Sequence, residues 1–168
     1  MKLNAGSGVG TKGYQTDFIN IDLLRPHKGV QGDILNLPFK DDSFEEVRAI
    51  HVLEHVLRHQ QMPMLGELHR VTAPGGVLYV EVPDFPENMV DLVRAYRQRN
   101  INWERVRIRT VGAFGKQRAP GDAHHWGYNE DFLRRQLGVF QWRSIDRSQT
   151  MISAHWHAES VILMKCVK

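Results

Sequence analysis

The chain has 168 residues, the length of one domain, of which 42% are hydrophobic and 24% charged, the balance of a globular protein. No apolar run approaches the ~18 residues of a membrane helix, and the first residues lack the apolar core of a signal peptide. We therefore expect a cytoplasmic protein with no membrane partner. The single cysteine, Cys166, excludes an intrachain disulfide and a metal site built from several cysteines.

The formal net charge of +3 is too small to argue for nucleic-acid binding. The charge is unevenly distributed, because the stretch from Arg94 to Arg118 holds eight lysines and arginines but one acid, Glu104. This basic stretch is either a solvated helix face or a surface that recognises an anionic substrate. Composition alone leaves both interpretations open.

Short apolar runs alternate with longer amphipathic stretches, a pattern that predicts β/α units around a mainly parallel sheet. The expected strands, which are apolar and short, span residues 2–5, 18–23, 28–33, 46–50 and 77–82. Two closing strands at 141–146 and 159–167 are expected to form an antiparallel hairpin. Helical spacing of apolar residues predicts helices at 58–72, 87–99 and 129–137, the first of them ended by Pro74-Gly75-Gly76.

Four glycines, at positions 6, 8, 10 and 13, follow the first expected strand. Glycine has no Cβ, so such a loop can bring backbone N–H groups close to a ligand. Gly8-x-Gly10-x-x-Gly13 fits the dinucleotide fingerprint, which requires a helix on the glycines and an acid about 20 residues later. Asp22 follows Gly13 too closely for such a helix, which argues against a nicotinamide cofactor.

Asn4-Ala5-Gly6-Ser7-Gly8 resembles the first motif of the class I S-adenosylmethionine-dependent methyltransferases. Further segments follow in the order of that family: Asp22, "GDILNLPF" at 32–39, "DDSFEEV" with "HVLEHV", and "ELHRVTAPGGVLYVEVPD" at 67–84. The resemblance is close over residues 2–84 and looser beyond them. It implies an α/β fold: a single Rossmann-like methyltransferase domain over 1–168, with a mainly parallel seven-strand-type sheet and a C-terminal antiparallel hairpin.

The resemblance also implies which residues bind S-adenosyl-L-methionine. The first motif, Asn4, Ala5, Gly6, Ser7 and Gly8, would line the cofactor, although Asn4 stands where the family usually has an acid. Asp22, followed by Leu23, would accept hydrogen bonds from the ribose hydroxyls. Asp33 would accept from the adenine amine, and Ile34 and Leu35 would contact the purine. His51, after the fourth strand, would line the same site.

Histidines form three clusters in the sequence. His51-Val-Leu-Glu54-His55 matches the H-x-x-E-H pattern of zinc peptidases, but a zinc site also needs a third ligand, a helix and an open cleft. We therefore expect no metal there. His155 and His157 are expected at or near the surface. His125, in the loop "GDAHHWGY", is a candidate general base, and His51 is the second catalytic candidate.

The sequence thus predicts a methyltransferase with a substrate cap at 85–127, acting on a small-molecule or glycan acceptor with an anionic group. A non-catalytic binding module with the same fold is the main alternative, and a nicotinamide-dependent oxidoreductase is a third. The acceptor, the use of a base and the oligomeric state stay open.

Overall fold

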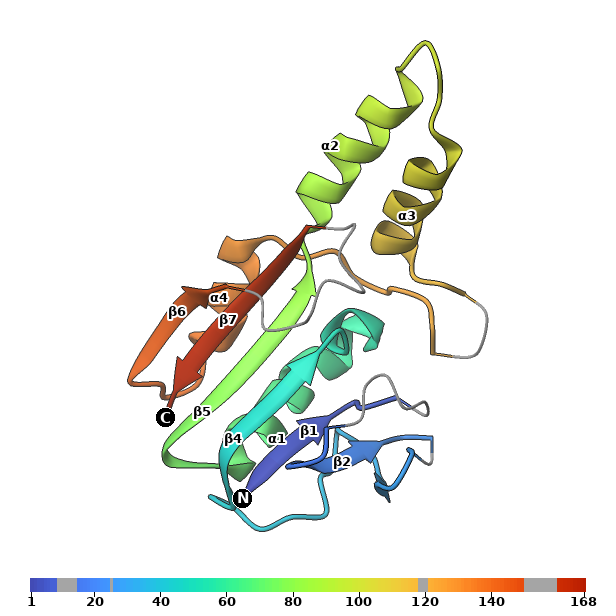
Figure 1. The fold of residues 1–168 in the computed structure, drawn as a ribbon. Coiled ribbons are helices and arrows are strands. Elements are labelled where there is room, and N and C mark those ends of the chain that lie inside the picture. The colour runs from blue at the N-terminus through green and yellow to red at the C-terminus, as the bar shows by residue number, and fades with distance from the viewer. Residues whose placement is uncertain (9–14, 25, 118–120, 150–159) are drawn as a thin grey trace.

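The computed structural model describes residues 1–8, 15–24, 26–117, 121–149 and 160–168. Its centre is a seven-stranded sheet with strand order β3-β2-β1-β4-β5-β7-β6 (Figure 1). The first five strands are parallel, and β7 runs antiparallel to both β5 and β6. The strands are β1 Lys2–Ala5, β2 Ile19–Asp22, β3 Val30–Gln31, β4 Phe44–Ile50, β5 Thr72–Pro83, β6 Ser144–Ser148 and β7 Val161–Val167. The predicted α/β fold with a C-terminal antiparallel hairpin is confirmed.

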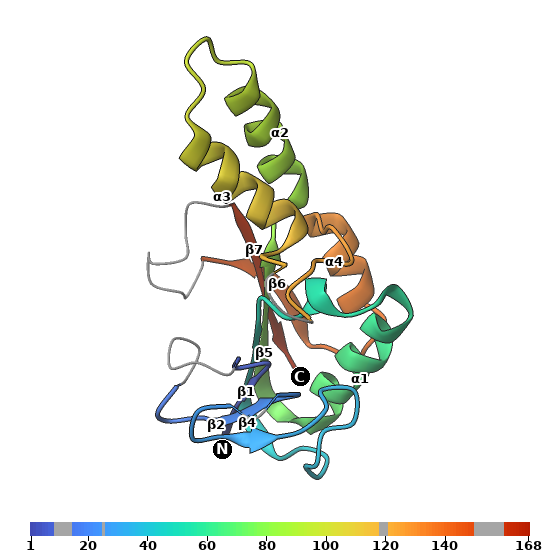
Figure 2. The same cartoon turned by 90° about the vertical axis from the view of Figure 1, so that its right-hand side faces the viewer.

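The described helices are arranged asymmetrically. Helices α1 (Gln61–Val71) and α4 (Glu130–Leu137) pack on one face of the sheet (Figure 2). Helices α2 (Phe85–Tyr96) and α3 (Trp103–Phe114) form a hairpin that extends beyond the end of β5 (Figure 1). Two 3-10 helices, η1 (Leu53–His55) and η2 (Arg58–Gln60), connect β4 to α1. None of the described helices has the length and apolar character that a bilayer span requires.

The core lies between the sheet and helices α1 and α4. Alternate residues of the central strands point toward these helices, because side chains of a strand alternate between the two faces. The fully buried apolar side chains of this layer include Leu3, Val47, Leu78, Val80 and Met164 from the sheet, and Leu65, Leu68, Leu133 and Leu137 from the helices. This layer holds the carboxyl ends of the parallel strands in a fixed row.

The opposite face of the sheet is polar at the same strands. Glu46 pairs with Arg48 at 2.6 Å and with Lys2 at 3.4 Å. The Arg48 guanidinium also lies over the Phe18 ring, 4.4 Å from its centroid, and donates to the Gln15 side chain. Among the described residues between β1 and β2 there is no helix, and the sequence places charges where a covering helix would need apolar residues.

Several predicted boundaries differ from the structure. Helix α1 ends at Val71, and the chain enters β5 directly at Thr72, so Pro74-Gly75-Gly76 lies inside a strand. The pairing of β4 with β5 shifts register between Phe44 and Glu46, which accommodates this irregular stretch. The strand expected at 28–33 shortens to two residues, and β6 begins at Ser144. Helix α3 lies inside the expected cap but was not predicted as a separate helix.

Candidate functional site

The loop after β1 makes a close approach to another segment. Gly6 and Gly8 have φ values of 73° and 71°, in the left-handed region that favours glycine. A Cβ on Gly6 would lie 2.3 Å from the Cγ2 atom of Val52, so this position has no room for a side chain. A Cβ on Gly8 would meet nothing within 4 Å. The loop is thus pressed against the segment after β4 at Gly6 and is open at Gly8. Gly10 and Gly13 lie outside the described residues.

Asp22, at the carboxyl end of β2, is oriented toward this loop. Its Oδ2 atom accepts a hydrogen bond from the backbone N–H of Gly8 at 2.8 Å, and Oδ1 accepts from the N–H of Leu24 at 3.1 Å. A carboxylate oxygen has two lone pairs, so each oxygen keeps one acceptor position. Two adjacent hydroxyls fit that pattern. Leu23, beside Asp22, is exposed.

The remaining predicted cofactor residues lie on β1 or in the loops that follow β1 and β3. Asp33 follows β3 and accepts from the N–H of Leu35 at 2.9 Å, while Ile34 and Leu35 pack partly against the core. Ala5 and Ser7 are buried. Asn4 is buried too, and its side-chain amide donates to Asn20 Oδ1 at 2.7 Å. Because β1, β2 and β3 are parallel, all these groups lie on the side of the sheet where the carboxyl ends of the strands meet.

His51 follows β4 at the same edge, with a left-handed φ of 54°. Its Nδ1 atom lies 3.3 Å from Glu54 Oε1, and its Nε2 atom lies 3.4 Å from Glu81 Oε1. Both glutamates are buried. Glutamates are rarely fully buried, so a cluster that holds two of them beside one histidine is unusual among the described residues.

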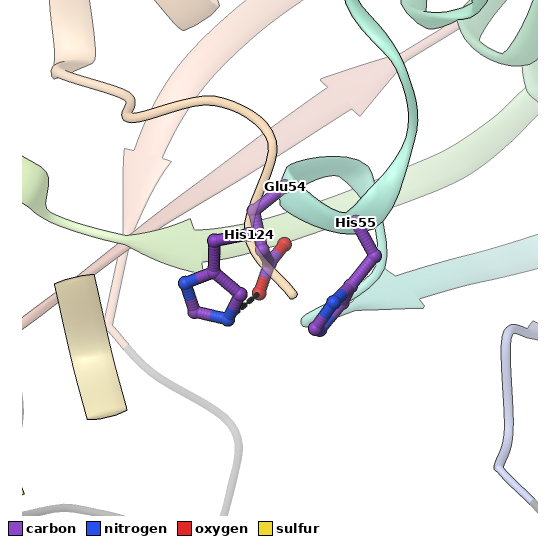
Figure 3. A group of neighbouring side chains, drawn as sticks. All are labelled: Glu54, His55 and His124. Atoms are coloured by element: carbon purple, nitrogen blue, oxygen red, sulfur yellow. Dashed lines mark ion pairs between the residues drawn. The ribbon is translucent and has the colours of Figure 1, made fainter. Parts of the chain in front are cut away.

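Glu54 is the centre of the cluster (Figure 3). Burial opposes its ionisation, yet the neighbouring imidazoles, His51 first and then His55 and His124, hold the pKa of Glu54 below its ordinary value. Burial lowers the pKa of His124, although the Glu54 charge opposes that shift. Burial also raises the pKa of the nearby Tyr128 phenol, with the Glu54 charge as a second cause. Glu54 is therefore a carboxylate at neutral pH, and the His124 imidazole is neutral.

The predicted catalytic histidines are separated by the fold. The side chain of His125 is exposed, and its backbone N–H donates to the Glu54 carbonyl at 2.7 Å. Its neighbour His124 faces Glu54 instead, with His124 Nε2 4.0 Å from Glu54 Oε1. The sequence analysis missed His124, Glu81 and Tyr128 as neighbours of this site. The presence of an acid inside the apolar strand 77–82 was the available signal for Glu81. His155 and His157 lie outside the described residues.

The H-x-x-E-H pattern does not form a helical face. His51 precedes η1, and the segment contains only the three-residue 3-10 helix Leu53–His55. The 51/55 pair on one helix, which a zinc-peptidase site requires, is therefore not formed.

Most arginines of the basic stretch that can be described are paired. Arg109 contacts Asp91 at 2.9 Å and donates to Asn88, and Arg105 reaches Asp91 at 3.5 Å. Arg107 pairs with Glu104 at 2.6 Å. Asp91 lies just before the stretch, so counting charges from Arg94 onward overstated the excess. Arg97 and Arg99, near the tip of the hairpin, are exposed.

A sequence-family model described as "Methyltransferase domain" matches residues 6–80. An uncharacterized protein of Methanocaldococcus jannaschii is 36% identical over 92 residues, which is 48% of this chain and 39% of that protein. The chain spans less than half the length of the curated relatives it matches.

Two solved structures share the fold at low sequence identity. An S-adenosylmethionine-dependent methyltransferase of Thermotoga maritima matches with a TM-score of 0.66 at 14% identity, over 99% of this chain and 81% of that one. A Burkholderia thailandensis 1,6-didemethyltoxoflavin-N1-methyltransferase with bound S-adenosylhomocysteine matches with a TM-score of 0.60 at 14% identity, over 99% and 70%. The family match covers Gly6, Asp22, Asp33 and η1, and the fold of the chain is that of solved S-adenosylmethionine-dependent methyltransferases.

Proposed function

We propose that this protein is an active methyltransferase that transfers the methyl group of S-adenosylmethionine to a small-molecule or glycan acceptor carrying an anionic group. The observation that carries the proposal is the oriented Asp22 carboxylate, bound to the Gly8 N–H at the end of β2. The orientation of this acid supports cofactor binding, which methyl transfer requires. The glycine loop and Asp33 complete a row of ligand-binding groups on one sheet edge.

The cofactor supplies an activated methyl group on a sulfonium, so the protein chiefly aligns the acceptor with that methyl. Asp22 would hold the ribose through its remaining lone pairs, and Asp33 would accept from the adenine amine. Ile34 and Leu35, half-buried beside Asp33, would contact the purine. The same site would also be lined by Asn4, Ala5, Ser7 and Leu23. A side-chain base is needed only where the acceptor atom carries a proton, and His51 and His125 remain the candidates for that role.

The helical hairpin α2–α3, with the loop up to Gly127, is the proposed substrate cap. It is anchored at the carboxyl end of β5 and therefore stands next to the edge that carries the glycine loop. Arg97 and Arg99 are exposed near the tip of the hairpin, so they would contact an anionic group on a part of the acceptor distant from the methylated atom, because arginine binds carboxylate and phosphate through two parallel hydrogen bonds.

Calorimetric titration separates this proposal from its two alternatives. We expect S-adenosylhomocysteine to bind and NAD to show no heat of binding. Binding of NAD in place of S-adenosylhomocysteine would favour the oxidoreductase. Binding of S-adenosylhomocysteine without methyl transfer to any member of an acceptor panel, assayed with labelled cofactor, would favour the non-catalytic module.

The Asp22→Ala variant tests the cofactor site directly. We expect weaker binding of S-adenosylhomocysteine by roughly 1.5–3 kcal/mol, the range for hydrogen bonds to a charged group. Asp146→Ala is the matched control, because Asp146 is an exposed acid on β6 at the far edge of the sheet. Equal affinity in the folded Asp22→Ala variant and the control would remove Asp22 from the cofactor site.

The anionic acceptor predicts a dependence on ionic strength. Raising the salt from about 0.05 to 0.5 M shortens the Debye length to a few ångströms, so the KM of an anionic acceptor should rise. Arg97→Ala/Arg99→Ala should raise KM at low salt and leave kcat unchanged. Arg109 is unsuitable for this test because its pairing with Asp91 and Asn88 is structural. A KM that is insensitive to both changes would show the basic stretch to be a solvated surface.

A further inference from the structure

Three side chains from two distant segments converge beside the glycine loop. Glu54 and His55 belong to η1, and His124 belongs to the loop that follows α3. One oxygen or nitrogen atom from each side chain lies within 4.8 Å of the atoms offered by the other two (Figure 3). The two imidazole rings are edge-to-face, with centroids 4.7 Å apart. The sequence could not reveal this trio because His124 lies far from the H-x-x-E-H pattern.

Backbone contacts determine which ring nitrogen of each histidine carries the proton. His55 Nδ1 lies 3.0 Å from the Ala123 carbonyl oxygen, and His124 Nδ1 lies 3.1 Å from the Gly112 carbonyl oxygen. A carbonyl oxygen only accepts, so Nδ1 is the protonated nitrogen in both rings. The lone pair of a ring with this tautomer is on Nε2, and His124 Nε2 is the ring atom that lies 4.0 Å from Glu54 Oε1. Histidines that bind metals are typically held in this way, with the other ring nitrogen donating to a carbonyl.

The Glu54 carboxylate is buried, and no group of the trio donates a hydrogen bond to it. Its side chain is 1% exposed, and neither oxygen has a hydrogen-bond partner of ordinary geometry among the described residues. The nearest groups are His51 Nδ1 at 3.3 Å and His124 Nε2 at 4.0 Å. A buried carboxylate beside the Nε2 lone pair of His124 is unfavourable unless a cation or a proton lies between them.

We propose that Glu54, His55 and His124 bind one divalent transition-metal ion of the Zn²⁺ type. Two imidazole nitrogens and one carboxylate are a known set of three protein ligands, which leaves a fourth coordination position open for another oxygen donor. Ligand atoms about 2.0–2.2 Å from an ion lie about 3–3.5 Å apart, so rotations of the side chains bring the present separations into range. The proposal revises the expectation from sequence that this segment binds no metal.

The position of the site indicates what the open coordination position would take. Val52, two residues before Glu54, is in contact with Gly6 of the glycine loop. The metal would therefore stand beside the cofactor. Resting on the proposed function, we infer that the ion holds an oxygen of the acceptor, either a hydroxyl or a carboxylate, within reach of the methyl group. Metal binding itself does not depend on that inference and is tested first.

Metal binding is measured on tag-free protein that has been dialysed against a chelator. Calorimetric titration with Zn²⁺ is expected to give one site per chain, and Co²⁺ is expected to give visible d–d absorption. We expect Zn²⁺ binding to weaken by at least about 10-fold in each of the variants Glu54→Gln, His55→Gln and His124→Gln. Mutation of residues that only hydrogen-bond to metal ligands already has effects of that size. Zn²⁺ should raise the Tm of the wild type but not of these variants.

Two controls address the other histidines of the chain. His59→Gln, an exposed residue of η2, and the double variant His155→Gln/His157→Gln should bind Zn²⁺ like the wild type. Circular dichroism checks folding, and His124→Gln remains informative if a Glu54 variant fails to fold because His124 is on a loop. S-adenosylhomocysteine titrations of the same variants show whether the cofactor site is intact, independently of the metal.

The proposal is overturned by an absence of Zn²⁺ binding at micromolar protein, or by binding that survives in all three ligand variants. Loss of binding in the His155→Gln/His157→Gln variant alone would place the metal elsewhere and overturn it as well. If Zn²⁺ binds as expected while no acceptor is methylated, the metal site stands and the proposed function fails.

Discussion

Gly6 and Gly8 share a backbone conformation but differ in their surroundings. Alanine variants at the two positions therefore separate the cost of backbone strain from the cost of a steric clash. Both have left-handed φ values, so alanine at either position costs about 1–2 kcal/mol of backbone strain. Only at Gly6 would the added Cβ clash with Val52. We expect Gly6→Ala to lower Tm more than Gly8→Ala and to abolish binding of S-adenosylhomocysteine. Equal Tm losses in thermal melts of the two variants would show that the Val52 contact relaxes freely.

Cys166 provides a probe of the core. It is fully buried, and burial raises the pKa of its thiol to about 12. A thiol must be deprotonated and accessible to react, so we expect no reaction with a thiol reagent in native protein at pH 8. One thiol per chain should react in denaturant. Fast labelling of the native protein would mean that β7 opens readily from β5.

At the scale of elements, Asn88 attaches the hairpin to the sheet. Asn88 is fully buried on α2, and its amide donates to the carbonyls of Asp84 and Ser160 at 2.8 and 2.9 Å. Its carbonyl oxygen accepts from the N–H of Ser160 and from Arg109. The hairpin otherwise has only a small core of its own, built on Leu92, Ala95 and Val106.

We therefore expect Asn88→Ala to loosen the hairpin selectively. Hydrogen exchange should accelerate in α2 and α3 while β4 and β5 stay protected, because the lost hydrogen bonds join the two units. Asn100→Ala, at the exposed tip of the hairpin, is the control and should leave exchange unchanged. Uniform acceleration across the sheet would show that Asn88 supports the whole fold instead.

The sequence predicted the elements whose signals are local. β1 was predicted with its observed ends, and α4 to within one residue, since apolar periodicity and the caps Asn129 and Gly138 mark that helix. The start of β5 was mispredicted because Pro74-Gly75-Gly76 usually ends an element, whereas here the register shift against β4 absorbs it. Helix α3 was missed because its apolar side chains are few and interrupted by arginines.

The candidate site was predictable to a similar degree. The glycine loop, Asp22 and Asp33 follow strands directly, so their meeting at one sheet edge follows from parallel pairing. The convergence of His124 on Glu54 depends instead on how the loop after α3 packs on η1, through the His125 N–H bond to the Glu54 carbonyl. No spacing along the chain encodes that contact.

At the scale of the whole molecule, the sheet has helices packed on one face and charges on the other. The described connections of β1, β2 and β3 contain no helix, and Lys2, Glu46 and Arg48 occupy the strand positions that face away from α1. The stability of the fold must therefore come mainly from the single apolar layer between the sheet and helices α1 and α4. Hydrogen bonds and ion pairs between elements add to it.

Two of these contacts involve the carboxylates of Glu67 and Glu130, and we expect them to govern how the stability of the fold changes in acid. Arg70, which also bonds the 37–41 loop, donates hydrogen bonds that lower the pKa of Glu67 on α1, outweighing the opposite effect of burial. Hydrogen bonds from Arg134 and Arg147 likewise lower the pKa of Glu130 and join α4 to β6. A pKa that is lower in the folded state adds stability above the unfolded value of 4.5. That contribution is lost as the pH falls through the folded pKa.

We therefore expect the Tm to be nearly constant from about pH 6 to 7.5 and to fall steeply below about pH 4.5, where these carboxylates take up protons. Glu67→Gln removes one charge without changing the size of the side chain, so it should lower the Tm at neutral pH and flatten the decline in acid. Glu45→Gln, an exposed acid at the start of β4, is the control and should follow the wild type. Thermal melts across the pH range measure both variants. An acid decline as steep in Glu67→Gln as in the wild type would show that the Glu67–Arg70 pair contributes nothing to the stability of α1 against the 37–41 loop.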